Sequence, residues 1–243
     1  MSLLMAKNPD YKNWLKVVLV LRTMKNGLHS FIEKEVNSFH QLLVQTLGNL
    51  QRCRECSYEN VMWKGRKWTF NPPCPNGVCD AWFRNLLTLF VKPNSKKINW
   101  ENCDIQAWPS SPWECAKSFM PRGKNYTTTG PVEFDAQALL TLMSNCNPIF
   151  KKLSIAGQER THKINKIRNR VIHSGDMKIT DSETRESIDQ IIQLLEDQPI
   201  LITECKEAVN EIKKVTLHNL QISRWHPNIN FQFGSINSLP CLV

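Results

Sequence analysis

The sequence predicts an all-α fold, a helical bundle interrupted by a small cysteine-rich insertion. Apolar residues recur at steps of three and four over most of the 243 residues, which is the period of an amphipathic helix. Alternating patterns typical of strands are nearly absent. One segment, 49–80, has no period and is instead rich in cysteine, proline, tryptophan and basic residues, which indicates an insertion held together by something other than an apolar core.

The first helical stretch runs from about Tyr11 to Gly48. Its apolar residues keep the same spacing on both sides of Gly27, which indicates two consecutive helices or one helix bent at the glycine. After the insertion, a short helix is expected over 80–90. A loop punctuated by tryptophan and proline then continues to residue 112.

Helical spacing returns after a polar connector at 124–131. Further helices are expected at 134–146, 161–173, 182–195 and 200–222. The chain is thereby divided into the N-terminal helices of the bundle (1–48), the cysteine-rich insertion (49–80), the remainder of the bundle (81–223) and a loosely ordered tail (224–243).

The charge balance favours an anionic partner. Lys and Arg number 31 against 22 Asp and Glu, a net charge of +9, so a polyanion such as RNA is a reasonable ligand. The start of the chain contains neither a secretory signal nor a stretch long enough to span a bilayer. We therefore expect a cytoplasmic protein without a membrane partner, whose cysteines are thiols or metal ligands and not disulfides.

Four cysteines form the clearest metal-binding pattern. Cys53 and Cys56 are followed after seventeen residues by Cys74 and Cys79. Two thiolate pairs on short turns suit tetrahedral zinc in a zinc-ribbon-like fold, so structural zinc is the expected cofactor. A closed four-sulfur site leaves no open coordination position for water, so the metal would be structural and not catalytic. Unbound thiols, or Cys103 as a substitute ligand, are the alternatives.

Between the two cysteine pairs lies the strip Trp63-Lys64-Gly65-Arg66-Lys67-Trp68. Aromatic rings interleaved with cations can stack on bases and neutralise phosphates. Alternatively, the two tryptophans pack under the zinc loops while the cations point to solvent. The candidate RNA-binding residues of this strip are Lys64, Arg66 and Lys67.

The helix expected at 161–173 carries Arg168, Asn169 and His173 near its end. Asn169 and His173 are four residues apart and therefore share a face, where the amide can orient the imidazole. Arg168 lies about 140° round an ideal helix from His173, so the two are expected to flank a groove and to point to solvent. The simpler interpretation is that both only bond the last carbonyls of the helix.

These residue types suit RNA cleavage by attack of the 2′-hydroxyl on the adjacent phosphorus. That reaction requires proton transfer and charge stabilisation but no metal. His173 would transfer protons, Arg168 would stabilise the phosphate and Asn169 would orient the imidazole. Because one chain supplies one such set, a homodimer would place two sets in one cleft. Candidate RNA contacts on the same basic helix are Lys163, Lys166 and Arg170.

An arginine, an asparagine and a histidine spaced in this way at the end of a late helix resemble the signature of the HEPN superfamily (higher eukaryotes and prokaryotes nucleotide-binding). Over roughly residues 11–180, the chain is also similar to a vertebrate family named after a mammalian X-chromosome open reading frame. The segments that carry this similarity are 11–14, Glu35 with 38–40, 116–123, 130–131, 135–136, 138–140 and 177–178.

The resemblance implies a helical bundle that dimerises through the motif helices and, in catalytic members, a metal-independent endoribonuclease. Other eukaryotic relatives are non-catalytic RNA- or nucleotide-binding modules. We therefore expect an RNA-binding HEPN-like protein and candidate endoribonuclease with a composite dimeric site. The alternative is a non-catalytic RNA- or protein-binding module. Similarity to virus-induced fish proteins further implies a role in antiviral innate immunity.

Overall fold

The computed structural model describes residues 8–48, 53–123 and 130–217. These residues form two compact units. The terminal unit contains the chain up to residue 28, residues 135–137 and the chain from 155 onward. The central unit contains residues 29–134 and 138–154. The tail expected at 224–243 lies outside the described residues.

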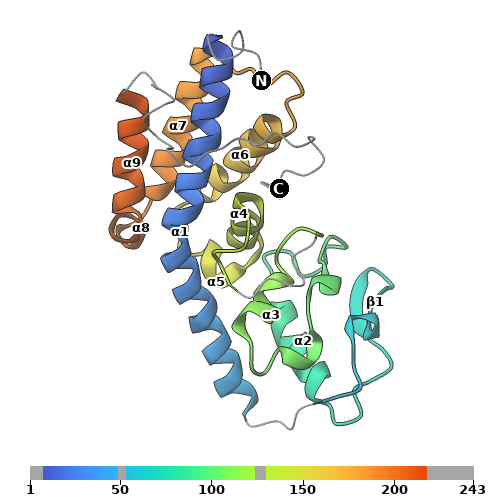
Figure 1. The fold of residues 1–243 in the computed structure, drawn as a ribbon. Helices are drawn as coiled ribbons and strands as arrows, with labels where there is room; N and C mark the ends of the chain where they lie inside the picture. Colours follow the sequence, from blue (N-terminus) through green and yellow to red (C-terminus); the bar gives the residue numbers. More distant parts are fainter. Residues whose placement is uncertain (1–7, 49–52, 124–129, 218–243) are drawn as a thin grey trace. The chain divides into compact units, whose positions relative to one another are not determined.

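Helix α1 (Pro9–Leu47) is one continuous helix whose first part belongs to the terminal unit and whose second part belongs to the central unit (Figure 1). Gly27 therefore does not separate two helices. Its role is to permit close packing, because a Cβ at this position would lie 2.5 Å from the Cβ of Ala208.

All the regular secondary structure among the described residues of the terminal unit is helical. Its helices after α1 are α6 (Ile155–Ile172), α7 (Asp181–Leu195), α8 (Pro199–Glu204) and α9 (Lys206–Leu217). Helix α7 begins with a capping box, in which Thr180 and Glu183 each bond the other's backbone N–H. The core is aliphatic, formed by Val17, Val20, Met24, Ile164, Val171, Ile188, Ile191, Leu194, Val209 and Ile212.

The central unit contains α2 (Val78–Thr88), α3 (Pro112–Lys117), most of α4 (Ala136–Asn145) and α5 (Asn147–Phe150). Short 3₁₀ turns lie at η2 (Tyr58–Asn60), η3 (Trp100–Asn102) and η4 (Ile105–Ala107). Its core is strongly aromatic, formed by Phe31, Phe39, Trp82, Phe83, Phe90, Trp100, Trp108, Phe119 and Phe134.

One antiparallel hairpin departs from the all-α prediction. Strands β1 (Val61–Lys64) and β2 (Lys67–Phe70) pair Trp63 with Trp68. The turn residues Gly65 and Arg66 both have positive φ, 59° and 64°, as a two-residue hairpin turn of the primed type requires. The prediction of a largely helical chain is confirmed, and the hairpin forms within the predicted insertion. No helix among the described residues is both long and apolar enough to cross a membrane.

Candidate metal centre and basic hairpin

The four cysteines of the insertion come together in the central unit. The sulfur atoms of Cys53, Cys56, Cys74 and Cys79 all lie within 4.8 Å of one another, and the four residues are buried. None of them forms a disulfide. Four sulfurs at about 2.3 Å from a zinc ion would be about 3.8 Å apart, so the cluster needs only a small contraction to hold a metal.

Hydrogen bonds prepare the first cysteine pair for a cation. The Glu55 N–H donates to Cys53 Sγ at 3.4 Å. Burial alone would raise the pKa of Cys53. Hydrogen bonds from backbone N–H groups and from the thiols of Cys56 and Cys74 outweigh this effect and lower the pKa to about 7. Burial and the neighbouring thiols raise the pKa of Cys56 to about 12 and also raise that of Cys79. A cation would remove this mutual repulsion among the sulfurs.

The second pair is positioned by the start of α2. Gly77, with a φ of 72°, precedes the helix and places Cys79 in its first turn. Asp80 accepts from the Cys74 N–H at 2.6 Å, and Asn76 Oδ1 accepts from the Cys74 thiol at 3.0 Å. The insertion is therefore a cysteine turn, a hairpin and a helix. The expected zinc-ribbon-like fold is corrected in this respect, because Cys74 lies in the turn before α2 and Cys79 lies in the first turn of that helix.

The cysteine cluster is fixed to the rest of the central unit. Gln106 Nε2 donates to the carbonyl oxygen of Cys56 at 2.9 Å. A second contact involves α2, whose Trp82 stacks on His40 with ring centroids 5.6 Å apart. The His40 Nε2 bonds the Trp108 carbonyl at 2.8 Å, and burial lowers its pKa. His40 is thus a core histidine whose buried ring is satisfied by a backbone carbonyl.

The hairpin presents cations above a base of packed tryptophans. Trp63 and Trp68 meet edge to face with centroids 5.3 Å apart, and Trp68 makes a similar contact with Trp100. Trp68 Nε1 also donates to the Ser95 carbonyl at 2.8 Å, which fixes the hairpin beside the loop that contains Ser95. Both tryptophans are half-buried, but only Trp68 is anchored to the loop by a hydrogen bond and to Trp100 by a ring contact.

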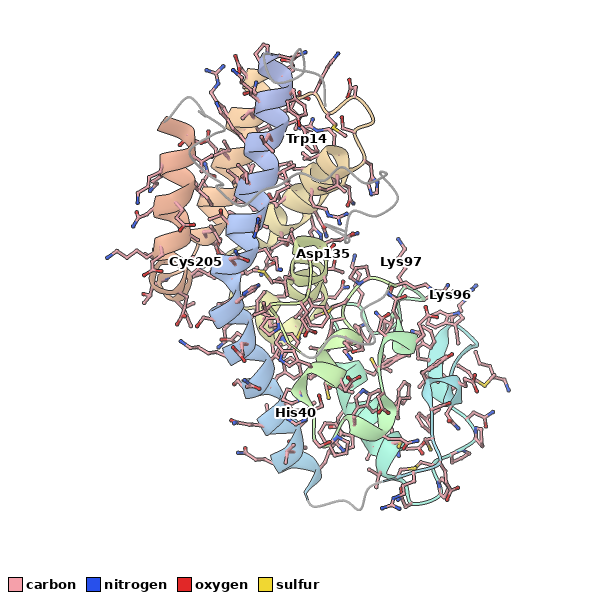
Figure 2. All side chains as sticks on the ribbon, viewed as in Figure 1. Trp14, His40, Lys96, Lys97, Asp135 and Cys205 are labelled. Atoms are coloured by element: carbon pink, nitrogen blue, oxygen red, sulfur yellow. The ribbon has the colours of Figure 1, made fainter. Side chains whose placement is uncertain are left out.

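Five exposed cations form what we call the basic hairpin surface: Lys64, Arg66, Lys67, Lys96 and Lys97. Figure 2 shows Lys96 and Lys97 projecting outward from the central unit. Over the described ranges 8–48, 53–123 and 130–217, none of the five side chains forms an ion pair with a carboxylate. Their positive charge is therefore fully available to an external anion.

The expectation that Arg168 faces solvent is wrong. Its side chain is 2% exposed and donates from Nη2 to Asp135 Oδ2 at 2.8 Å and from Nη1 to Asn169 Oδ1 at 3.1 Å. The physical reason is its position on the buried stripe of α6, together with Thr161, Ile164 and Val171. Asn169 and His173 are exposed. The predicted groove between Arg168 and His173 therefore does not form within the chain.

The predicted RNA contacts on α6 remain on the surface. Lys163, Lys166 and Arg170 are all exposed. Arg170 donates to Glu183 Oε1 at 2.8 Å, so one of the three charges is already compensated. On α6, therefore, one of the three cations is paired with a carboxylate, whereas none of the five cations of the basic hairpin surface is so paired within the part of the chain that the structure describes.

The buried ion pair gives a stability prediction. Replacing Asp135 with alanine removes the carboxylate that pairs with the buried Arg168 guanidinium. We expect this change to destabilise the terminal unit by about 3 kcal/mol. Amide hydrogen exchange of α6 measures this change in the terminal unit alone. The matched control is Asp189→Ala, which removes an exposed carboxylate of α7 and is expected to cost less than about 0.5 kcal/mol. Equal effects of the two substitutions would contradict a structural role for the pair.

Comparisons with known proteins place the chain among its relatives. Residues 6–238 match a family model described as a domain of unknown function, DUF4559. The mouse protein named "Uncharacterized protein CXorf38 homolog" is 35% identical over 183 residues, which is 73% of this chain and 52% of the mouse protein. The chain therefore spans about half the length of this curated relative. No solved structure gives a significant match.

Proposed function

This chain belongs to the DUF4559 family, and we propose that its central unit is a zinc-stabilised module that binds single-stranded RNA. The HEPN-like interpretation of the helices is part of this proposal in its non-catalytic form. The proposal needs no second copy of the chain.

The metal in this proposal is structural zinc. Four thiolates and no oxygen or nitrogen ligand match the ligand set of closed structural zinc sites. The ion would be held by Cys53, Cys56, Cys74 and Cys79, which are gathered and buried. Its charge compensates the thiolates, and its bonds join the chain before the hairpin to the helix after it. A hairpin whose strands have only four residues each needs such support, because an isolated two-stranded hairpin is only marginally stable in water.

The single observation that supports RNA binding is the basic hairpin surface, whose five exposed cations have no carboxylate partner in the described chain. Cations of this kind neutralise phosphates. Trp63 directly precedes Lys64 in β1 and is half-buried, so the accessible part of its side chain can stack on an unpaired base. A base is available for stacking only where the strand is unpaired, which favours single-stranded over duplex RNA.

The endoribonuclease expectation is the less well supported alternative. Its mechanism requires a guanidinium that reaches a phosphate, but Arg168 is occupied by Asp135 beneath the surface. His173 is exposed, and the described α6 places no free guanidinium of the motif beside it. The geometry therefore favours the runner-up, a binding module without turnover.

Photo-crosslinking tests where the RNA lies. We expect a 12-nucleotide RNA containing 4-thiouridine to crosslink to peptides from 58–70 and 92–100, because these segments carry the cations and the accessible aromatic ring. Mass spectrometry of the digested complex identifies the peptides. Crosslinks confined to α6 would contradict the proposal and return the RNA site to the terminal unit.

A further inference from the structure

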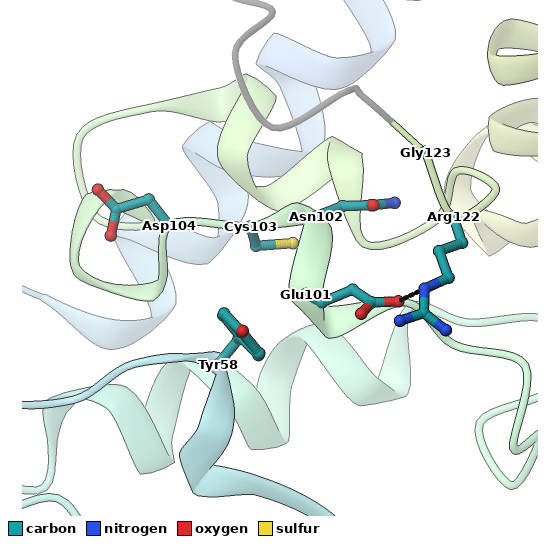
Figure 3. Close-up of a pocket in the computed structure, with 7 residues that line it drawn as sticks. All are labelled: Tyr58, Glu101, Asn102, Cys103, Asp104, Arg122 and Gly123. Atoms are coloured by element: carbon teal, nitrogen blue, oxygen red, sulfur yellow. Dashed lines mark ion pairs between the residues drawn. The ribbon is translucent and has the colours of Figure 1, made fainter.

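The central unit contains a pocket that the proposed function does not use. Its cavity volume is about 540 Å³, and the side chains that line it include Tyr58, Glu101, Asp104 and Arg122 (Figure 3). This volume falls within the range of small-ligand sites in proteins. The lining side chains come from η2, from η3 and the turn after it, and from the segment that follows α3.

The backbone of the pocket is held in place before any ligand binds. Asn102 is buried, and its Nδ2 donates to the carbonyl oxygens of Lys117 at 3.2 Å and Pro121 at 3.0 Å. The Asp104 N–H donates to Glu114 Oε2 at 2.7 Å. These bonds join η3 to α3 and to the residue before Arg122. A ligand would therefore not have to order the pocket, which reduces the entropic cost of binding.

Three exposed groups converge on the cavity. Tyr58 is 44% exposed. Arg122 Nε donates to Glu101 Oε1 at 2.6 Å, and the two side chains are 79% and 34% exposed. Figure 3 shows the Glu101 carboxylate between the Tyr58 ring and the Arg122 guanidinium. The ion pair fixes one carboxylate oxygen and leaves Oε2 available to a donor.

This set of groups is complementary to one nucleobase. A tyrosine ring or an arginine plane stacks on an unpaired base, and a carboxylate accepts hydrogen bonds but donates none. On its Watson–Crick edge, guanine presents two adjacent donors, N1–H and the N2 amino group. Adenine, cytosine and uracil have no two adjacent donors on this edge, so a carboxylate that receives a hydrogen bond from one of their donors also meets a neighbouring acceptor, which it repels. A pocket with an aromatic face and a fixed carboxylate therefore selects guanine.

We propose that this pocket binds a guanine base, with Tyr58 stacking on the ring and Glu101 accepting from its Watson–Crick edge. The inference rests on the proposed function, because we assign the base to the RNA strand on the basic hairpin surface. Glu101 follows Lys97 by four residues, a span of at most about 14 Å. Tyr58 lies three residues before β1. A strand bound to the lysines is therefore within reach of the pocket.

The test compares RNA strands that differ in one base. The strands are a 12-nucleotide oligouridine and its variants with one central guanine, adenine or inosine, and fluorescence anisotropy measures their affinity for the full chain. We expect the guanine strand to bind about tenfold more tightly than the adenine strand. Inosine lacks the N2 amino group and is expected to fall between them. In the Glu101→Gln variant, the guanine and adenine strands should bind equally.

The matched control is Glu59→Gln. Glu59 is exposed and adjacent to Tyr58, but it is not among the residues that line the pocket, and its substitution changes the net charge by the same amount. The control should keep the guanine preference. The Glu101→Gln and Glu59→Gln variants should bind plain oligouridine within about twofold of each other, which separates the loss of a base contact from a general charge effect.

The outcomes separate the pocket from the proposed function. Equal affinity of the wild type for guanine and adenine strands, or a guanine preference that survives Glu101→Gln, would overturn the pocket assignment while leaving RNA binding intact. If no strand binds, the proposed function fails, and free guanosine monophosphate then tests the pocket through NMR shifts of Tyr58 and Glu101. Shifts at these residues support a site for the free nucleotide, and their absence refutes it.

Discussion

Replacing Cys79 with serine is expected to abolish zinc binding and to destabilise the central unit by more than about 4 kcal/mol. Serine is a poor zinc ligand, and Cys79 supplies the bond from the first turn of α2. Without that bond, the hairpin loses its connection to the helix. Elemental analysis measures the zinc content, which should fall from one ion per chain to nearly none. Amide hydrogen exchange over 61–70 measures the loss of protection in the hairpin.

The control for this experiment is Cys103→Ser. Cys103 is also buried in the central unit, but it lies outside the four-sulfur cluster. Its substitution should leave one zinc ion per chain and keep the hairpin protected, and this result would also exclude Cys103 as a substitute ligand. Wild-type protein that contains no zinc, or a Cys79→Ser variant that retains it fully, would contradict the metal assignment.

Removing the three cations of the hairpin tip is expected to weaken RNA binding by about 100-fold at 0.1 M salt. The variant carries Lys64→Gln, Arg66→Gln and Lys67→Gln, which remove the charge and keep a polar side chain at each position. Each phosphate contact on a single strand contributes about 0.7 to the logarithmic salt slope. Three contacts therefore account for about two orders of magnitude at this salt concentration. Fluorescence anisotropy with a 12-nucleotide oligouridine measures the change.

The comparison variant removes three cations from α6 through Lys163→Gln, Lys166→Gln and Arg170→Gln. It has the same net charge as the hairpin variant. Because these side chains are exposed but Arg170 is already paired with Glu183, we expect a loss of less than about threefold. A larger loss in the α6 variant than in the hairpin variant would place the RNA site on the terminal unit.

The cysteine cluster could be predicted from the sequence because metal chemistry constrains spacing directly. The helix that contains its last cysteine is also encoded in the sequence. Asn76-Gly77 is a turn signal, and Asp80 stabilises a helix start, while Val78, Trp82 and Leu86 repeat at four-residue steps. The predicted helix began only two residues late, at 80 instead of 78.

Arg168 shows where sequence reasoning fails. Its charge suggested solvent, yet it shares the three- and four-residue spacing of Thr161, Ile164 and Val171. That spacing was the available signal for burial. The residue that compensates the charge, Asp135, lies 33 positions away in the sequence, and no local pattern pairs the two. From the sequence alone, a buried and paired arginine therefore cannot be distinguished from a catalytic arginine.

The hairpin and the pocket could not be predicted for a related reason. Strands of four residues with Lys64 opposite Lys67 are too short to show a reliable alternating pattern. The pocket combines Tyr58, Glu101 and Arg122, which are widely separated along the chain and are brought together only by the packing of short turns. Sites assembled from distant loops have no spacing for a sequence pattern to detect.

The measurement that tests the central claim most directly is the salt dependence of RNA affinity in the wild type and in the hairpin variant. Both should give straight lines of log affinity against log salt concentration. Our account predicts that the slope of the variant is shallower by about two units, because three phosphate contacts are lost. Parallel lines with the same slope would contradict it, since the basic hairpin surface would then make no contact with the RNA backbone.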